Sequence, residues 1–197
     1  MAENNKIGNP GPIGLMGFGM TTILLNIHNL GVTLLDGHIL GMGLFVGGIA
    51  QIIAGIFEMK KGNTFASTAF TLYGFFWISF VYLLIYCPVK TTPIGMAFYL
   101  LIWGLFTTYM FIGTLKLNKV LQLIFGSLSI LFYILVIENF MKVANLTVIA
   151  EIIARIAGVI GVFCGGSAFY LAMAEILNET YGKIVLPIDI EKDEYNN

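Results

Sequence analysis

Runs of apolar residues, separated by short polar segments, fill almost the whole chain. The hydrocarbon core of a bilayer is about 30 Å thick, and a helix needs roughly 20 apolar residues to cross it. Six runs approach that length, and polar residues, glycine or proline separate them. We therefore predict an all-α membrane protein with six transmembrane helices. The predicted spans are residues 13–35, 39–59, 65–86, 93–115, 120–140 and 148–177.

Short loops join these spans, so we predict a single transmembrane domain, residues 1–197, that ends in a polar cytoplasmic tail, residues 183–197. Lysine and arginine collect in the cytoplasmic loops of membrane proteins. Seven lysines lie on the side of the predicted spans that carries both termini, and two lie on the other side. This bias predicts a multi-pass protein of the cytoplasmic (inner) membrane with both termini in the cytoplasm.

Composition narrows the classes of function. Charged residues make up 11% of the chain, against about 25% in soluble domains, and the mean hydropathy is +0.89. A net charge of −1 and the absence of a basic block argue against a nucleic-acid partner. The two cysteines and two histidines form no metal-ligand pattern, and no catalytic motif occurs. We therefore expect no metal site, no cofactor, no catalytic residues and no enzyme activity.

The first predicted span carries the most polar side chains. Phe18, Thr22, Asn26 and Asn29 follow one another at steps of four, four and three, which places them on one helical face. Thr21 lies on the adjacent stripe. These groups could hydrogen-bond a small polar solute in a path through the protein, or they could bond neighbouring helices. Their grouping on one face favours a path.

Three further residues have two interpretations each. Gln51 is the lone polar side chain in a glycine-rich part of the second span, and it either lines a path or bonds a neighbouring helix. His28 is a candidate for proton handling, because imidazole titrates near neutrality, or it donates one structural hydrogen bond. Glu58 lies near a helix end, where we expect it to reach water, and it is a second candidate for proton handling.

The residues before the first span, Gly8-Asn9-Pro10-Gly11-Pro12, predict a special entrance to the helix. Proline disfavours a helix before it, so we expect extended backbone that gives way to a helix at Pro12. Free N–H groups at such a helix start can bind an anion. Asn9 and Pro10 are therefore candidate path residues, with an ordinary Pro-Gly turn as the alternative.

The segment NPGPIGL, at residues 9–15, is similar to the NPAPLGL signature of the acetate uptake transporters, the succinate–acetate permease family. The similarity continues through GFGMTTILLNIHNLG, TLYGFFWISF and SAFYLAMAEILNETYGKIVLP, so it covers nearly the whole chain. Gly11 and Ile13 depart from the Ala and Leu of the signature, and both changes are small.

The resemblance implies a six-helix protomer that assembles into a homo-oligomer, a hexamer, with a separate path through each protomer. It implies passage of acetate, and in some members succinate, with protons or down a gradient. It also implies a hydrophobic constriction made by a Phe, a Tyr and a Leu, which by motif position are Phe18, Tyr73 and Leu128. Trp77, one turn after Tyr73, either lines the same path or packs between helices.

These observations together predict transport of acetate and related small carboxylates, as a proton symporter or as a channel. Acetic acid can carry its own proton, so the sequence does not decide between the two. The alternative is a channel for small neutral solutes, since aquaporin-type pores also use the Asn-Pro dipeptide, which occurs once here. A sensor or scaffold is less favoured, because the short loops leave little surface for partners.

Overall fold

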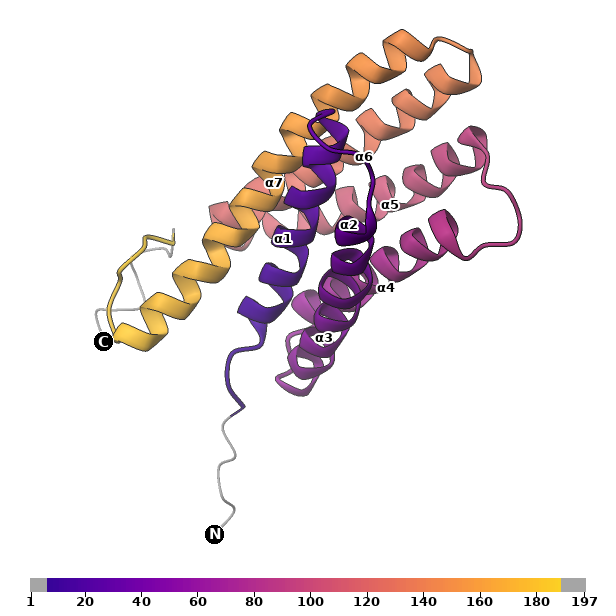
Figure 1. Cartoon of the computed structure of the whole chain (residues 1–197). Coiled ribbons are helices and arrows are strands. Elements are labelled where there is room, and N and C mark those ends of the chain that lie inside the picture. The colour runs from indigo at the N-terminus through magenta and orange to yellow at the C-terminus, as the bar shows by residue number, and fades with distance from the viewer. Residues whose placement is uncertain (1–6, 189–197) are drawn as a thin grey trace.

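The computed structural model describes residues 7–188, and every long element within that range is a helix (Figure 1). The elements are α1 (Gly11–Asn29), α2 (Gly37–Gly41), η1 (Met42–Ala50), α3 (Gln51–Lys60), α4 (Thr64–Ile85), α5 (Pro93–Thr114), α6 (Lys119–Val143) and α7 (Thr147–Tyr181). The segments α2, η1 and α3 form one continuous rod, so the bundle has six rods. The predicted all-α fold with six membrane helices is confirmed.

Five of the rods are long and apolar enough to cross a bilayer by themselves. The remaining rod, α1, has 19 residues and is about 28 Å long. It runs antiparallel to α7 and touches it closely, since a Cβ atom on Gly19 would lie 2.9 Å from the Gly165 carbonyl oxygen. Its polar residues Thr21, Thr22 and Asn26 are buried between helices, so α1 presents its polar groups to the protein interior.

The ends of α1 differ from the prediction of 13–35. The helix begins at Gly11, because Pro10 has helical backbone angles (φ −83°, ψ −11°) and its carbonyl accepts the Ile13 N–H. The helix ends at Asn29, and Gly31 takes a left-handed conformation (φ +82°). The apolar residues between Gly31 and Asp36 form a loop, which hydropathy alone cannot distinguish from a helix.

The last helix is longer than the predicted 148–177. It continues to Tyr181 and stops at Gly182, which has a left-handed backbone (φ +61°) that suits glycine at a helix C-terminus. The first residues of the predicted tail then fold back onto α7, because Asn178 Oδ1 accepts the N–H groups of Val185 and Leu186. The rest of the predicted tail, residues 189–197, lies outside the described residues.

The nine-residue π-helix η1 was not predicted. It contains the buried glycines Gly43, Gly47 and Gly48, which allow α1 and α4 to approach it on either side. A Cβ atom on Gly47 would lie 2.9 Å from side-chain atoms of both Thr21 and Trp77. The glycine-rich stretch thus serves as a packing surface with π-helical geometry.

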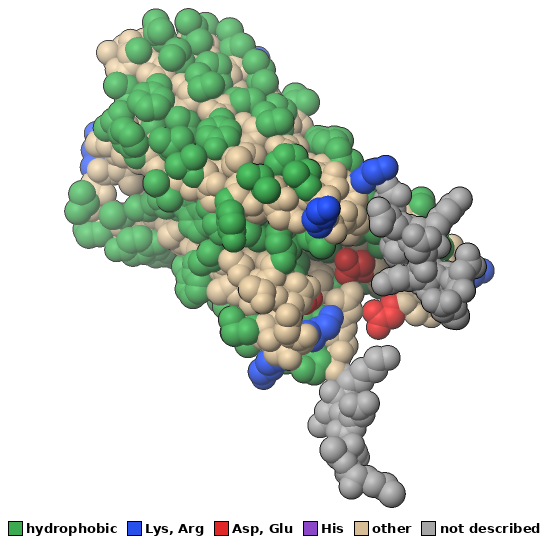
Figure 2. All heavy atoms as spheres, turned by 180° about the vertical axis from the view of Figure 1, so that it is seen from behind, with side chains coloured by type: hydrophobic (Ala, Val, Ile, Leu, Met, Phe, Trp, Pro, Cys, Tyr) green, Lys and Arg blue, Asp and Glu red, His purple; other side chains and the backbone are tan. Residues whose placement is uncertain are grey.

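The surface and the chain ends agree with a multi-pass membrane protein. Apolar side chains cover the flanks of the bundle in Figure 2, and the acidic and most of the basic side chains visible there gather near one end. The start of α1 and the end of α7 lie together at that end, where Asn9 contacts Glu175 (Figure 1). The side of the membrane on which this end lies remains a prediction.

Candidate permeation path

Four cavities follow one another through the bundle. A cavity of about 250 Å³, here called the terminal-side vestibule, lies at the end that carries the chain termini and is lined by Asn9, Glu58 and Glu175 among others. A cavity of about 320 Å³, the distal vestibule, is lined by residues that include His28, Asn29 and Lys142. Two small cavities, of about 20 and 40 Å³, lie between the vestibules.

Shared lining residues give the order of the cavities. The smaller central cavity shares Phe70 and Phe125, among others, with the terminal-side vestibule. The larger central cavity shares Leu25, Asn29 and Phe76, among others, with the distal vestibule. The two central cavities share three residues with each other, Phe18, Tyr73 and Leu128. The four cavities therefore form a column, and this shared set lies at its middle.

The set of Phe18, Tyr73 and Leu128, here called the central ring, brings together residues of α1, α4 and α6. All three are at least nine-tenths buried, and the Phe18 and Tyr73 ring centroids are 6.1 Å apart. The residues that the family resemblance assigned to a constriction thus meet in space at the narrow part of the column.

Tyr73 is held in place by Thr107 of α5. The Thr107 hydroxyl donates its one hydrogen to the Trp103 carbonyl oxygen at 2.7 Å, so the Tyr73 hydroxyl must donate to Thr107 Oγ1 at 2.8 Å. Phe106 packs against the Tyr73 ring, with centroids 5.4 Å apart. Thr107 was not predicted from the sequence, and the only signal for it is general, since a buried tyrosine hydroxyl usually finds a partner.

Buried polar atoms without a protein partner lie on both sides of the central ring. Gln51 lines the smaller central cavity, and its Nε2 donates to the Gly47 carbonyl oxygen at 2.7 Å. A carbonyl only accepts, so the amide must present its nitrogen there, and Oε1 is left without a partner. Thr22 lines the larger central cavity, and its Oγ1 is also unpartnered. Each buried polar atom without a partner lowers the stability of the fold by about 1–3 kcal/mol unless a solute or water forms a hydrogen bond with it.

The other predicted residues of the α1 face line the larger central cavity. Asn26 donates through Nδ2 to the Thr22 carbonyl oxygen at 2.8 Å and accepts from Asn29 Nδ2 at 3.0 Å. Gly161 of α7 makes room for this side chain, since a Cβ atom there would overlap the Asn26 carboxamide. Trp77 lines the same cavity and also packs against η1, and its role in a path stays a prediction.

Two predicted path residues lie away from the column. The Thr21 hydroxyl donates to the Gly17 carbonyl oxygen at 2.7 Å and lies 3.4 Å from that of Met42. Neither Thr21 nor Pro10 lines any of the four cavities. Thr21 instead joins α1 to η1, because its position one residue before Thr22 turns it about 100° around the helix, and Pro10 is buried as the cap of α1.

The terminal-side vestibule places a carboxylate of the protein beside the start of α1. Asn9 Nδ2 donates to Glu175 Oε2 at 2.9 Å, and Asn9 Oδ1 accepts from the Gly11 N–H at 3.1 Å and from Lys61 Nζ at 3.4 Å. The prediction of an extended entrance with free N–H groups was therefore wrong, since Asn9 Oδ1 accepts the Gly11 N–H and the carbonyl oxygen of the cap residue Pro10 accepts the Ile13 N–H. Glu58 does not reach open water as predicted, because it is buried, with Oε2 unpartnered, among the residues that line this vestibule.

The distal vestibule contains an ion pair that sequence reasoning did not single out. Lys142 Nζ lies 2.5 Å from Glu138 Oε1, and Asn139 Nδ2 donates to Glu138 Oε2 at 2.9 Å. The i,i+4 spacing of Glu138 and Lys142 was the available signal. His28 also lines this cavity, and its Nδ1 donates to the Thr33 carbonyl oxygen at 2.9 Å. In the neutral imidazole, Nε2 is therefore an acceptor.

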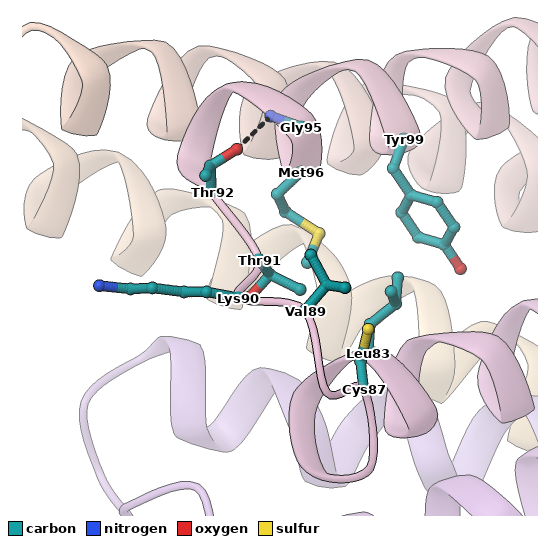
Figure 3. A pocket seen from close by; sticks show the side chains of 9 residues that line it. All are labelled: Leu83, Cys87, Val89, Lys90, Thr91, Thr92, Gly95, Met96 and Tyr99. Atoms are coloured by element: carbon teal, nitrogen blue, oxygen red, sulfur yellow. Dashed lines mark hydrogen bonds between the residues drawn. The ribbon is translucent and has the colours of Figure 1, made fainter.

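A further cavity of about 340 Å³ adjoins the distal vestibule at the loop between α4 and α5 (Figure 3). It shares Thr91, Thr92 and Met96 with that vestibule. The Thr92 hydroxyl accepts the Gly95 N–H at 3.2 Å and caps α5. Lys90 extends away from the other side chains drawn in Figure 3, so the interior of this cavity is mainly apolar.

Comparison with known proteins decides the family. The model of the GPR1/FUN34/yaaH family matches residues 1–189. The chain belongs to the GPR1/FUN34/yaaH family. Within this family it is 54% identical to the succinate-acetate/proton symporter SatP of Escherichia coli (strain K12), over 94% of this chain and 97% of that protein. The predicted resemblance to succinate–acetate permeases is thereby confirmed.

Two further relatives of the GPR1/FUN34/yaaH protein broaden the comparison. The solved structure of the bacterial acetate channel SatP is 53% identical and superposes with a TM-score of 0.86, over 93% of this chain and 99% of that chain. The ammonia transport outward protein 2 of Saccharomyces cerevisiae is 37% identical, over 89% of this chain and 64% of the yeast protein. The six-helix fold is thus shared with a channel of known structure.

Proposed function

We propose that the protein transports acetate and similar small carboxylates, succinate among them, across the cytoplasmic membrane through the column of cavities in each protomer. The observation that carries the proposal is the column itself, in which two vestibules lead to a hydrophobic ring with unpartnered polar atoms on either side. The relatives support the solute, since one is named a succinate-acetate/proton symporter and one an acetate channel.

The central ring would select by size and hydration. Hydrophobic constrictions exclude water and hydrated ions, whereas acetate can turn its methyl group toward Phe18 and Leu128. Gln51 and Thr22 would supply hydrogen bonds just before and just after the ring, in place of bonds to water. Conduction needs sites that bind weakly enough to release the solute, and single polar atoms meet that requirement.

Protons can cross with the solute in more than one way. The residues that line the two central cavities include no Asp, Glu, Lys, Arg or His, and burying an unpaired carboxylate among apolar side chains is costly. The solute would therefore cross the ring most readily with its own proton. His28 and Glu58, one in each vestibule, are the candidates for handling that proton, in a symporter or in a channel.

We also propose that protomers assemble into a homo-oligomer, a hexamer by the family resemblance, with a separate path in each. Large apolar side chains remain exposed on the flanks of the single chain, including Phe45, Ile53, Ile156 and Phe163. Lipid tails and neighbouring copies would cover these flanks. The column lies within one chain, so each protomer would conduct by itself.

A channel for small neutral solutes is the second candidate. Two observations favour it, namely the uncharged lining of the central cavities and the name of the yeast relative, an ammonia transport protein. Both functions can use the same column, because an undissociated acid and ammonia are each uncharged and small.

Purified protein in liposomes tests the proposed function. Labelled acetate uptake would be followed with and without an inward proton gradient, beside uptake of methylamine and of water. We expect protein-dependent acetate uptake that a proton gradient accelerates. Acetate uptake at the same rate with and without the gradient would indicate a channel. Methylamine uptake without acetate uptake at any gradient would leave only the neutral-solute channel.

A further inference from the structure

The distal vestibule holds one ammonium group in a fixed position. Glu138 is held through both oxygens, by Lys142 Nζ on Oε1 and by Asn139 Nδ2 on Oε2. Asn139 is itself anchored, since Nδ2 also donates to the Leu135 carbonyl oxygen at 2.8 Å. The Glu138 side chain is 8% exposed and that of Lys142 is 47% exposed. A buried carboxylate thus fixes an ammonium group that still faces the cavity.

Donors on this ammonium group and on two other side chains that line the same cavity remain available for a ligand. Lysine has three N–H donors, and one of them serves Glu138. The Thr92 hydroxyl accepts the Gly95 N–H, so its hydrogen is free to be donated. Asn29 uses one hydrogen of its amide on Asn26 and keeps the other. All three side chains line the same cavity of about 320 Å³.

From this arrangement we propose that Lys142 is the carboxylate-capture residue of the distal vestibule, with Glu138 as the group that positions it. The ligand is a small mono- or dicarboxylate, because a carboxylate accepts several hydrogen bonds and charge-assisted bonds to an ammonium group are strong. Thr92 and Asn29 supply neutral donors to the second carboxylate oxygen. This inference rests on the proposed function and adds to it the first binding step at this end of the column.

Glu138 also sets how tightly the site holds its ligand. A lone ammonium group in a cavity would bind a carboxylate strongly and release it slowly. The carboxylate 2.5 Å away offsets much of that positive charge, so a captured solute can move on toward Asn29 and the larger central cavity. A conducting path requires this balance between binding and release.

Four variants in proteoliposomes test the proposal by separating the half-saturation concentration for acetate from the maximal rate. Lys142→Met should raise the half-saturation concentration roughly tenfold, as expected for loss of one charge-assisted bond. Glu138→Gln should lower both the half-saturation concentration and the maximal rate, because release becomes slower. The double variant, which carries both Lys142→Met and Glu138→Gln, should lose less acetate uptake than Lys142→Met alone, because it leaves no buried unpaired carboxylate.

Lys90→Met is the matched control, because Lys90 lies at the same end of the bundle but lines the adjoining cavity and points away from it (Figure 3). It should leave both parameters unchanged. If Lys142→Met yields too little folded protein, the double variant alone tests the capture site. Its half-saturation concentration should then lie above that of the parent. An unchanged half-saturation concentration in Lys142→Met and in the double variant, or an equal rise in Lys90→Met, would overturn the capture site. Absence of acetate uptake by the parent protein would instead overturn the proposed function.

Discussion

The Tyr73 hydroxyl donates a hydrogen bond to Thr107 Oγ1 across 2.8 Å, and this bond joins α4 to α5 at the narrow part of the column. Both side chains are almost fully buried, so no water can replace either partner without a rearrangement. The orientation of the Tyr73 ring, and with it the width of the central ring, depends on a residue that does not itself line the cavities.

Replacing Thr107 should therefore change selectivity without removing any residue of the path. Thr107→Val leaves the Tyr73 hydroxyl buried without a partner, which costs about 1–3 kcal/mol and frees the ring to turn. We expect the uptake ratio of succinate to acetate to change. Thr108→Val is the control, because the Thr108 hydroxyl bonds Ser129 and Tyr133 and not Tyr73. A ratio that shifts equally in both variants would argue against the Tyr73 link.

Truncating the ring itself should alter size selection directly. Phe18→Ala or Tyr73→Ala enlarges the passage, so larger monocarboxylates should enter faster relative to acetate, while assembly stays intact. Phe75→Ala is the control, since Phe75 lies on α4 but is 53% exposed on the flank. Competition of labelled acetate uptake by carboxylates of increasing length measures the effect. If both ring variants transport like the parent, the proposed constriction is wrong.

The unpartnered oxygen of Gln51 predicts a role in rate. Gln51→Leu keeps the size of the side chain and removes the acceptor beside the ring, so acetate uptake should fall by about tenfold. Gln122→Leu is a suitable comparison, because Gln122 donates to the Thr114 carbonyl oxygen and lines none of the four cavities. Initial uptake rates at equal protein content test this, and an undiminished rate in Gln51→Leu would show that the solute does not use this atom.

Gly161 should not tolerate a side chain. A Cβ atom there would overlap the Asn26 carboxamide, so Gly161→Ala must displace Asn26 or separate α1 from α7. We expect a destabilisation of roughly 1–3 kcal/mol and a lower acetate uptake. Gly166→Ala, five residues along the same helix, meets nothing within 4 Å and should behave like the parent. Thermal unfolding in detergent compares the two, and equal stability would contradict the contact.

Much of the architecture could be predicted because it depends on local pattern. The apolar runs predicted the six rods, and the spacing of Phe18, Thr22 and Asn26 predicted the face of α1 that lines the column. The meeting of Phe18, Tyr73 and Leu128 could be expected only through the family resemblance, since no spacing rule joins residues of three separate helices.

What could not be predicted depends on contacts between distant segments or on geometry that hydropathy ignores. Thr107 supports Tyr73 from 34 residues away. Thr21 and Thr22 have the same side chain, and only the rotation of α1 about its axis in the bundle determines that Thr22 lines the column and Thr21 does not. Glu138 follows an apolar run near a helix end, where a carboxylate can ordinarily reach water, yet packing of α6 buries it with Lys142 as its partner.

Chemical modification of a cysteine at the central ring tests the central claim, that the solute passes between Phe18, Tyr73 and Leu128. The measurement is acetate uptake by Leu128→Cys after treatment with methyl methanethiosulfonate, in a chain whose Cys87 and Cys164 have been replaced by serine and alanine. Ile130→Cys is the control on the same helix, because Ile130 is 53% exposed on the flank. Modification should stop uptake by the Leu128 variant only, and acetate should slow the modification. Full uptake by the completely modified Leu128 variant would contradict a path through the central ring.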